Sequence, residues 1–321
     1  MKHPHLHIAP NIAYSYLKYI QTLVSKKKPI ILWRSLLTVL LICLCFDNAQ
    51  AKTPLHIGFL EYAVSDISIE DTKVAINLYL QKVLKDTRFE PQTVFFQNIE
   101  DLKNALHNQT IEMASISSVD FLLLSPDSLL VASTIRVSYD NNIFNAYTLL
   151  VHKDRNWSSL AELQNTHLRF PHKETISEIW LDVLLAENNL PQMPQFFSKI
   201  TQDERASQSV LAVFFNQADA CIITTRSFQI ISELNPQISQ AVISLAVSPE
   251  YLPSILCFHT KLSLSDREVL EQAALSLANN TEGKQVLKLF KSKEVIKVKP
   301  IYFETISHLL IQHEKYYGTR N

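Results

Sequence analysis

Segments with the character of strands and helices alternate along this chain, and the alternation begins twice. Short apolar runs are followed by stretches in which apolar residues recur at helical spacing, first from Leu55 and again from Ala146. Strands that alternate with helices form sheets through right-handed crossovers. The pattern therefore predicts an α/β protein built around two sheets. The expected strands are residues 55–60, 90–96, 111–116, 146–152, 167–170, 196–200, 218–224, 242–245 and 255–259.

In sheets of this kind, ligands bind beyond the carboxyl ends of the strands. Glu61 and Tyr62 follow the first expected strand, and Ser115, Ser117 and Ser118 lie at the end of the third. We expect these side chains to contact a ligand. The alternatives are a solvated loop for Glu61 and capping of the next helix for the serines, a role that is compatible with ligand binding.

Glycine is scarce, and its scarcity excludes several enzyme classes. The chain has only Gly58, Gly283 and Gly318, so no dinucleotide-binding loop, phosphate-binding loop or nucleophile elbow can be formed from them. Neither C-x-x-C nor H-E-x-x-H, two common zinc-binding patterns, occurs. No matched acid and base suggests general catalysis. We therefore expect no catalytic residues, no cofactor and no metal site.

The net charge and the cysteine content limit the class of partner and the number of disulfide bridges. The net charge is -1, which does not suit a nucleic-acid-binding protein, so the expected partner is a small molecule. Cys221 and Cys257 lie in apolar strand-like runs, which favours two buried thiols over a disulfide bridge between them. We expect a monomer.

The N-terminal region has the order of an export signal. Basic residues precede an apolar run at residues 36–46, which Ala49-Gln50-Ala51 follows. The run is short for a membrane span, which needs about 20 residues. We expect residues 1–51 to be a signal peptide with a long basic region and the mature protein to be periplasmic. An uncleaved anchor is the alternative.

Four blocks of sequence resemble a known family. Residues 55–59 resemble its opening strand, and residues 112–121 (EMASISSVDF) resemble its D-L-A-x-L-G-P-x-S-Y. Residues 149–163 contain counterparts of V-V-R-K-D and S-L-A-D-L, and residues 218–253 contain counterparts of A-D-A and S-P-P-I-P. In this order, the blocks resemble the phosphate/phosphonate-binding proteins of ABC importers, the PhnD-like branch of the type 2 periplasmic binding protein fold.

The resemblance implies a two-lobed fold with two mixed sheets flanked by helices and a ligand cleft between the lobes. Lobe one would comprise residues 52–143 and 247–321, and lobe two residues 144–246. Lobe closure would capture a small anionic or zwitterionic ligand of the phosphonate or phosphate class for an ABC permease. A ligand-sensing module for a membrane receptor is the alternative, and a dehydratase-type enzyme on the same fold is a third.

The resemblance also implies an anion site at a helix start, where backbone N–H groups and the helix dipole favour negative charge. The matching segment keeps hydroxyls at Thr175 and Ser177, and His172 adds positive charge. It departs from the family at Ile176, which replaces a hydroxyl, and at Glu178, which replaces a glycine. These departures favour a singly anionic or zwitterionic ligand over a doubly charged phosphonate.

Two further side chains are expected to contact the ligand. Tyr139 precedes the first segment that would cross between the lobes, and Thr224 ends a strand of lobe two. The family's Ser-His before the following helix has no counterpart in residues 203–206.

Overall fold

A computed structural model divides the chain into residues 1–51 and a compact unit of residues 52–321. The apolar run at residues 36–46 and the expected site residues Glu61, Tyr62 and Tyr139 lie outside the described residues. Within the described residues, none of the helices has the length and hydrophobicity that a membrane span requires. The structure describes residues 52–60, 69–124, 127, 129–138, 141–172 and 175–318.

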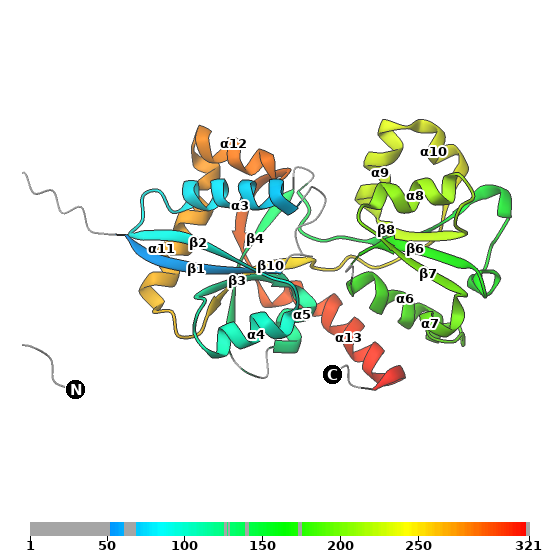
Figure 1. The fold of residues 1–321 in the computed structure, drawn as a ribbon, viewed down its shortest axis with the longest axis horizontal. Coiled ribbons are helices and arrows are strands. Elements are labelled where there is room, and N and C mark those ends of the chain that lie inside the picture. Colours follow the sequence, from blue (N-terminus) through cyan, green and yellow to red (C-terminus); the bar gives the residue numbers. More distant parts are fainter. Residues whose placement is uncertain are drawn as a thin grey trace, which may run out of the picture. The chain divides into compact units, whose positions relative to one another are not determined.

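The described residues form two mixed sheets (Figure 1). The first has six strands in the order β11-β4-β10-β3-β1-β2, of which β1 is parallel to β2 and β3, while β10 is antiparallel to both β3 and β4. In chain order its strands are Thr53–Leu60 (β1), Phe89–Phe96 (β2), Met113–Ser117 (β3), Leu130–Ser138 (β4), Ser254–His259 (β10) and Ser292–Lys297 (β11).

Side chains alternate between the two faces of this sheet, and each face has its own core. Leu55 and Ile57 of β1 pack with residues of α3, whereas Ile116 of β3 packs with Leu102 and Leu106 of α4. The two cores fix the register, because a slip of one residue would exchange the faces. The helices of this part of the chain are Ile69–Val83 (α3), Ile99–His107 (α4), Ser118–Leu124 (α5), Leu264–Leu275 (α11), Thr281–Leu289 (α12) and Glu304–Tyr317 (α13), with 3-10 turns Ser276–Asn279 (η5) and Pro300–Phe303 (η6).

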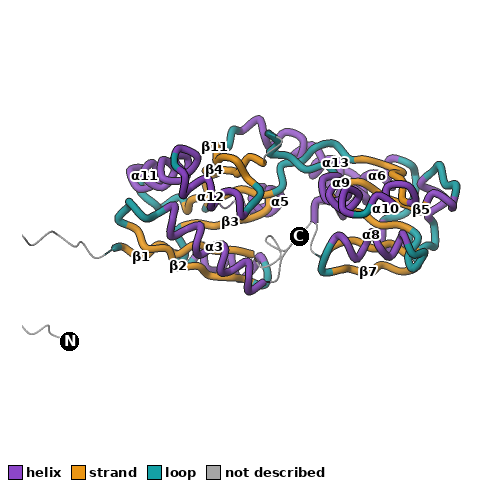
Figure 2. Tube along the Cα trace, turned by 90° about the horizontal axis from the view of Figure 1, so that it is seen from above, coloured by secondary structure: helices purple, strands orange, loops and turns teal. Residues whose placement is uncertain are grey.

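The second sheet has five described strands in the order β7-β6-β8-β5-β9. Strands β6, β7 and β8 are parallel to one another, and β5 runs antiparallel to β8 and β9. Figure 2 shows the strands of each sheet lying among helices. The strands of the second sheet are Tyr147–His152 (β5), His167–Pro171 (β6), Lys199–Asp203 (β7), Ala220–Thr224 (β8) and Val242–Val247 (β9).

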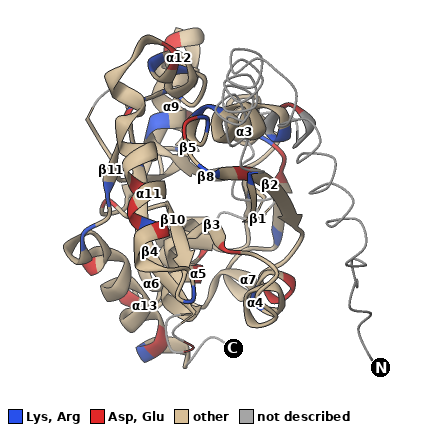
Figure 3. Cartoon of the chain, turned by 90° about the vertical axis from the view of Figure 1, so that its left-hand side faces the viewer, with Lys and Arg blue, Asp and Glu red and all other residues tan. Residues whose placement is uncertain are grey.

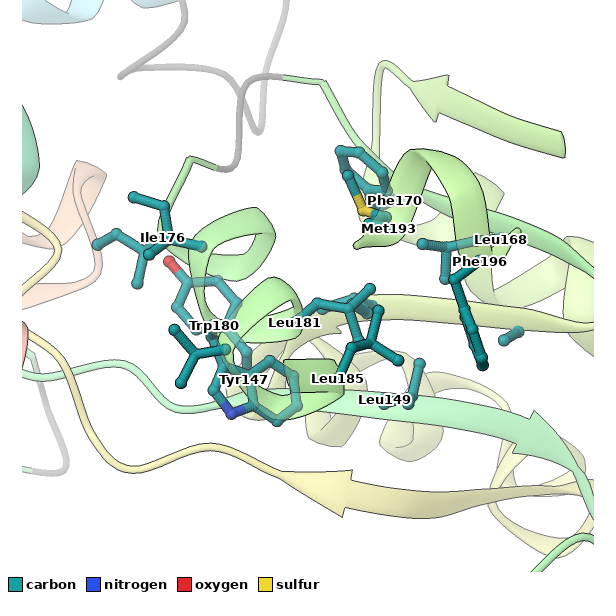
Figure 4. Packing of buried hydrophobic residues seen from close by; sticks show 14 of the residues in the cluster. Tyr147, Leu149, Leu168, Phe170, Ile176, Trp180, Leu181, Leu185, Met193 and Phe196 are labelled. Carbon is teal, nitrogen blue, oxygen red and sulfur yellow. The ribbon is translucent and has the colours of Figure 1, made fainter. Parts of the chain in front are cut away.

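Helices cover both faces of the second sheet as well. On one face, Phe170 and Leu149 belong to the same buried cluster as Trp180 and Leu181 of α6 (Figure 4). On the other face, Cys221 packs with residues of α8 and α10. The helical segments are Thr175–Glu187 (α6), Met193–Phe196 (α7), Ala206–Phe214 (α8), Thr225–Leu234 (α9) and Pro236–Ala241 (α10), with 3-10 turns Lys153–Arg155 (η3) and Leu160–Leu163 (η4).

The α/β prediction with two mixed sheets is confirmed, but some expected elements need correction. The strand expected at 196–200 begins at Lys199, because Met193–Phe196 is a short helix with a proline in its first turn. Strands β4 and β11 were not predicted. The expectation of buried thiols is confirmed, since Cys221 and Cys257 are free, buried and in different sheets, and burial raises the pKa of both.

The C-terminal helix α13 contacts both halves of the structure. It follows β11 of the first sheet, but it packs against α6 of the second sheet and against α5. Ile306 and Leu309 are buried in the core that contains α6, and the Tyr317 hydroxyl donates to the carbonyl oxygen of Asp182 at 3.0 Å. The segment expected to belong to lobe one thus has its C-terminal helix packed on the elements expected to form lobe two.

Candidate functional site

Two segments of chain connect the two sheets. The strand registers show that each segment runs from the carboxyl edge of one sheet to the carboxyl edge of the other. Strand β10 begins with Ser254 paired to Ser117, the last residue of β3. Strand β5 begins with Tyr147 paired to Thr224, the last residue of β8, and β9 ends at the same edge. Residues 248–253 therefore run from one carboxyl edge to the other, and a six-residue segment spans at most about 21 Å.

The other connecting segment leads from β4 to β5, is described over residues 141–146, and is joined to residues 248–253 by hydrogen bonds. The backbones of Asn145 and Tyr251 exchange two N–H to carbonyl hydrogen bonds, each 2.8 Å long. The Tyr147 N–H donates to the Ser248 hydroxyl at 2.8 Å, and the Asn142 amide donates to the Glu250 carboxylate at 2.9 Å. These bonds make the connection between the carboxyl edges a short two-stranded ribbon.

At the carboxyl edge of the first sheet, the three serines have different surroundings. Ser117 caps α5, since its hydroxyl accepts the N–H of Asp120 at 3.0 Å and donates to the Asp120 carboxylate at 2.6 Å. Ser118 is fully buried, and its hydroxyl donates to the carbonyl oxygen of Leu252 at 2.5 Å. Ser115 is half-buried, two residues before the strand end. In this structure, Ser118 has a structural role, and Ser117 keeps partial exposure to solvent.

The second sheet brings the other expected site residues to one edge. Because β6 and β8 are neighbouring parallel strands, His172 and Thr224 follow or end strands at the same side of the sheet. Thr175 is the half-buried first residue of α6, and Ser177 is buried. The Thr224 hydroxyl caps α9 by accepting the Ser227 N–H at 3.2 Å. Thr224 therefore serves as a helix cap, and its contact with a ligand stays a prediction.

A neighbouring hydroxyl at the same edge lacks a partner. The Oγ1 atom of Thr225, the first residue of α9, is buried and makes no hydrogen bond within the described part of the chain. A buried hydroxyl without a hydrogen-bond partner destabilises the folded protein, because the same hydroxyl is hydrogen-bonded to water in the unfolded chain. A ligand atom or a water molecule at this position would restore the bond.

Gln202 links His172 to Glu178. The His172 Nδ1 atom lies 2.6 Å from Oε1 of Gln202, whose amide nitrogen donates to Glu178 at 3.5 Å. An ionised carboxylate only accepts hydrogen bonds, so it orients the Gln202 amide with its oxygen toward the histidine. Nδ1 must then carry the proton, and Nε2 is left to contact solvent or a ligand. The Glu178 carboxylate is thus turned toward Gln202.

The residues after β7 were missed as part of the candidate site. Asp203 forms a buried ion pair with Arg169 and accepts a hydrogen bond from Ser209. Arg205 is exposed at the start of α8, and within the described ranges no carboxylate pairs with its guanidinium group. The sequence prediction considered only the family's Ser-His in this segment, so it included neither Asp203 nor Arg205. The strand end and the basic residue at a helix start could have indicated them.

A groove on the surface lies away from the candidate site. A groove of about 560 Å³ runs between the end of α3 and the helices α11 and α12, and none of the expected site residues lines it. Lys82 and Lys85 approach Glu282 there at 3.0 and 3.5 Å, and these contacts lower the pKa of Glu282. Figure 3 shows both signs of charge on α12. Topology, and not cavity size, therefore locates the candidate ligand site.

Comparison with known proteins agrees with the topology. The model of the family described as "ABC transporter, phosphonate, periplasmic substrate-binding protein" matches residues 64–301. The chain belongs to this family. The members of this family are periplasmic solute-binding proteins and not enzymes. Membership of the family implies that the protein delivers its solute to an ABC permease. The PhnD-like resemblance of the sequence is thereby confirmed.

Solved structures of the same fold share little sequence with the family member described here. PhnD1 from Prochlorococcus marinus in complex with methylphosphonate has a TM-score of 0.64 and 14% identity, over 82% of this chain and 98% of that one. The binding protein component of an ABC phosphonate transporter from Pseudomonas aeruginosa has a TM-score of 0.64 and 15% identity, over 82% and 87%. A Xanthomonas citri protein bound to ATP has a TM-score of 0.65 and 10% identity, over 84% and 100%.

At these identities the neighbours establish the type 2 periplasmic binding protein fold and leave the ligand open. No curated protein sequence matches the chain. Among the described residues, no group of three or more His, Cys, Asp and Glu side chains is placed to hold a metal ion.

Proposed function

We propose that this family member captures a small solute bearing an oxyanion, singly anionic or zwitterionic, between the carboxyl edges of its two sheets. The observation that carries the proposal is the register: both connecting segments run from one carboxyl edge to the other, which keeps the edges within reach of one small ligand. Ligands of parallel sheets bind at such edges. Closure around the ligand would bury most of its surface.

The side chains at the second edge support the charge class of the ligand. Thr175 offers a neutral hydroxyl donor at the start of α6. Because Nδ1 of His172 carries the proton toward Gln202, Nε2 donates to an oxyanion only when the ring is protonated at both nitrogens. The carboxylate of Glu178 adds a negative charge in the first turn of the same helix. One neutral hydroxyl, at most one positive charge from His172 and one nearby carboxylate favour one negative charge on the ligand over two.

Lobe motion would take place at the paired segments. We assign lobe one to residues 52–143 and 247–321, lobe two to residues 144–246, and the hinge to the ribbon around Asn145 and Tyr251. A hinge closes by rotation of a few residues between rigid bodies. Because α13 packs on α6, the turn before α13 acts as a third connection.

A thermal-shift panel tests the ligand class. The panel contains methanesulfonate, methylphosphonate, an aminoalkylphosphonate and inorganic phosphate, and we expect the singly anionic or zwitterionic members to bind most tightly. A ligand at about 100 times its dissociation constant stabilises the protein by about 2.7 kcal/mol. For a unit of this length, that corresponds to a melting shift of about 5 °C.

Two variants locate the site. Replacing both Thr175 and Ser177 with alanine should abolish the shift. Because Ser177 is only 1% exposed, Thr175→Ala alone is the cleaner variant, and it should remove most of the shift without changing the melting temperature of the free protein. A full shift in Thr175→Ala would place the ligand elsewhere.

Gene deletion distinguishes an importer from a sensory module. If the protein serves a permease, a strain that lacks it loses uptake of the ligand found in the panel. If it serves a membrane receptor, uptake persists and the transcriptional response to the ligand disappears. We expect the loss of uptake.

A further inference from the structure

We propose that Asp203 is a positioning residue of the ligand site and holds together the two turns that carry the second carboxyl edge. The inference rests on the proposed function, because it concerns the edge at which the ligand would bind. Asp203 is the last residue of β7 and is level with Pro171, the last residue of β6. The turns that begin α6 and α8 follow these two residues.

The Asp203 side chain connects three elements. Its carboxylate accepts two hydrogen bonds from the guanidinium group of Arg169 on β6, one of them from Nε at 3.0 Å. It also accepts the hydroxyl of Ser209 on α8 at 2.6 Å. Asp203 is 6% exposed and Ser209 is fully buried, so the hydrogen bond between them is shielded from water.

The backbone of the same residue extends the connection. The carbonyl oxygen of Asp203 accepts the N–H of His172 at 2.7 Å, in the turn that leads to α6. On the other side, the Arg205 N–H donates to the Gln208 side chain at 3.1 Å, which fixes the start of α8. The Asp203 backbone therefore holds His172 directly, and Arg205 lies in the turn that leads to α8, the helix that the Asp203 carboxylate holds through Ser209.

The charge of Asp203 is needed for this arrangement. Its hydrogen bonds raise the pKa of Arg169 above the ordinary value for arginine. An asparagine in place of Asp203 would keep the shape, but it would leave the guanidinium group without its counter-charge and present an amide N–H to a donor. The two turns would then lose their common anchor while the strands keep their ladders.

The same sheet contains a matched control at its opposite edge. Asp219 precedes β8, pairs with Arg155 at 2.6 Å and accepts the N–H of His167 at 2.9 Å. Asp219 thus joins an arginine to the backbone of β6, whereas the Asp203 carboxylate joins an arginine of β6 to Ser209 of α8. Asp219 also differs in lying at the amino edge, away from the candidate site.

Hydrogen exchange and ligand titration of the full-length mature protein test the proposal. In Asp203→Asn, we expect amide exchange at His172 and at residues 205–208 to accelerate at least tenfold. The dissociation constant for methanesulfonate, the singly anionic member of the panel, should increase at least tenfold at a temperature well below melting. In Asp219→Asn, exchange should accelerate near His167, and the dissociation constant should stay within twofold of the original.

Each outcome decides one point. Equal weakening of binding in both variants, or unchanged exchange at His172 in Asp203→Asn, would overturn the proposal. If Asp203→Asn does not fold, Ser209→Ala removes one donor and keeps the ion pair, and it should show the same pattern with a smaller change. If the wild type binds no member of the panel, the proposed ligand class is wrong, while the exchange measurement still decides whether Asp203 holds the turns.

Discussion

The hydroxyl of Ser118 connects helix α5 to the ribbon between the sheets, and its removal tests that connection. The Ser118 hydroxyl donates to the Leu252 carbonyl oxygen, and its N–H donates to the carbonyl oxygen of Pro253 at 3.1 Å. Both Ser118 and Leu252 are fully buried. The sequence places Ser118 among the expected ligand contacts, whereas these bonds give it a structural function.

The structure sets the size of the effect. Ser118→Ala would leave a buried carbonyl oxygen without its donor, which costs about 1–3 kcal/mol of unfolding free energy. Residues 52–321 have an unfolding entropy of about 0.6 kcal/mol per kelvin near the melting temperature, by scaling with length. The melting temperature should therefore fall by about 2–5 °C.

Calorimetry of the free and liganded protein provides the assay, and Thr175→Ala provides the matched control. Ser118→Ala should lower the melting temperature of the free protein, while the increase in melting temperature caused by the tightest ligand of the panel stays the same. Thr175→Ala should show the opposite pattern, with an unchanged melting temperature and a lost shift.

The reasoning is refuted if Ser118→Ala leaves the melting temperature of the free protein unchanged and loses the ligand shift. Ser118 would then contact the ligand, and its hydrogen bond to Leu252 would have no energetic weight. A loss of both quantities would show that the ribbon must be fixed for binding.

Three further predictions concern other parts of the chain. Gly283→Ala would place a Cβ atom 2.0 Å from the Leu277 carbonyl oxygen, so calorimetry should show that the free energy of unfolding falls by about 1–3 kcal/mol or more. An unchanged melting temperature would contradict this prediction. Tyr317→Phe removes the hydrogen bond to Asp182 and should cost about 0.5–1.5 kcal/mol in urea unfolding, unless α13 is held by its apolar face alone. Mass spectrometry of the exported protein should find Lys52 at the N-terminus, whereas an intact chain in the membrane fraction would favour the anchor.

Local sequence patterns predicted much of the fold. The alternation of apolar runs and helical spacing predicted two sheets, and the structure has them. At residues 158–163, the Glu162 carboxylate accepts the N–H groups of Ser158 and Ser159, four and three positions earlier, which lowers the pKa of Glu162. Such features are predictable because each depends on residues a few positions apart.

The partners of the polar side chains were decided by tertiary structure. Ser118 meets the Leu252 carbonyl across 134 positions, and Arg169 meets Asp203 across 34. These pairs form because the strand registers bring distant segments to one edge of a sheet, and no periodicity encodes which side chains then meet. The sequence by itself determined the two-sheet fold, and it predicted the strand ends at which we propose that a ligand binds. The packing of distant segments determined which hydroxyls at those edges are engaged in the fold and which are left for a ligand.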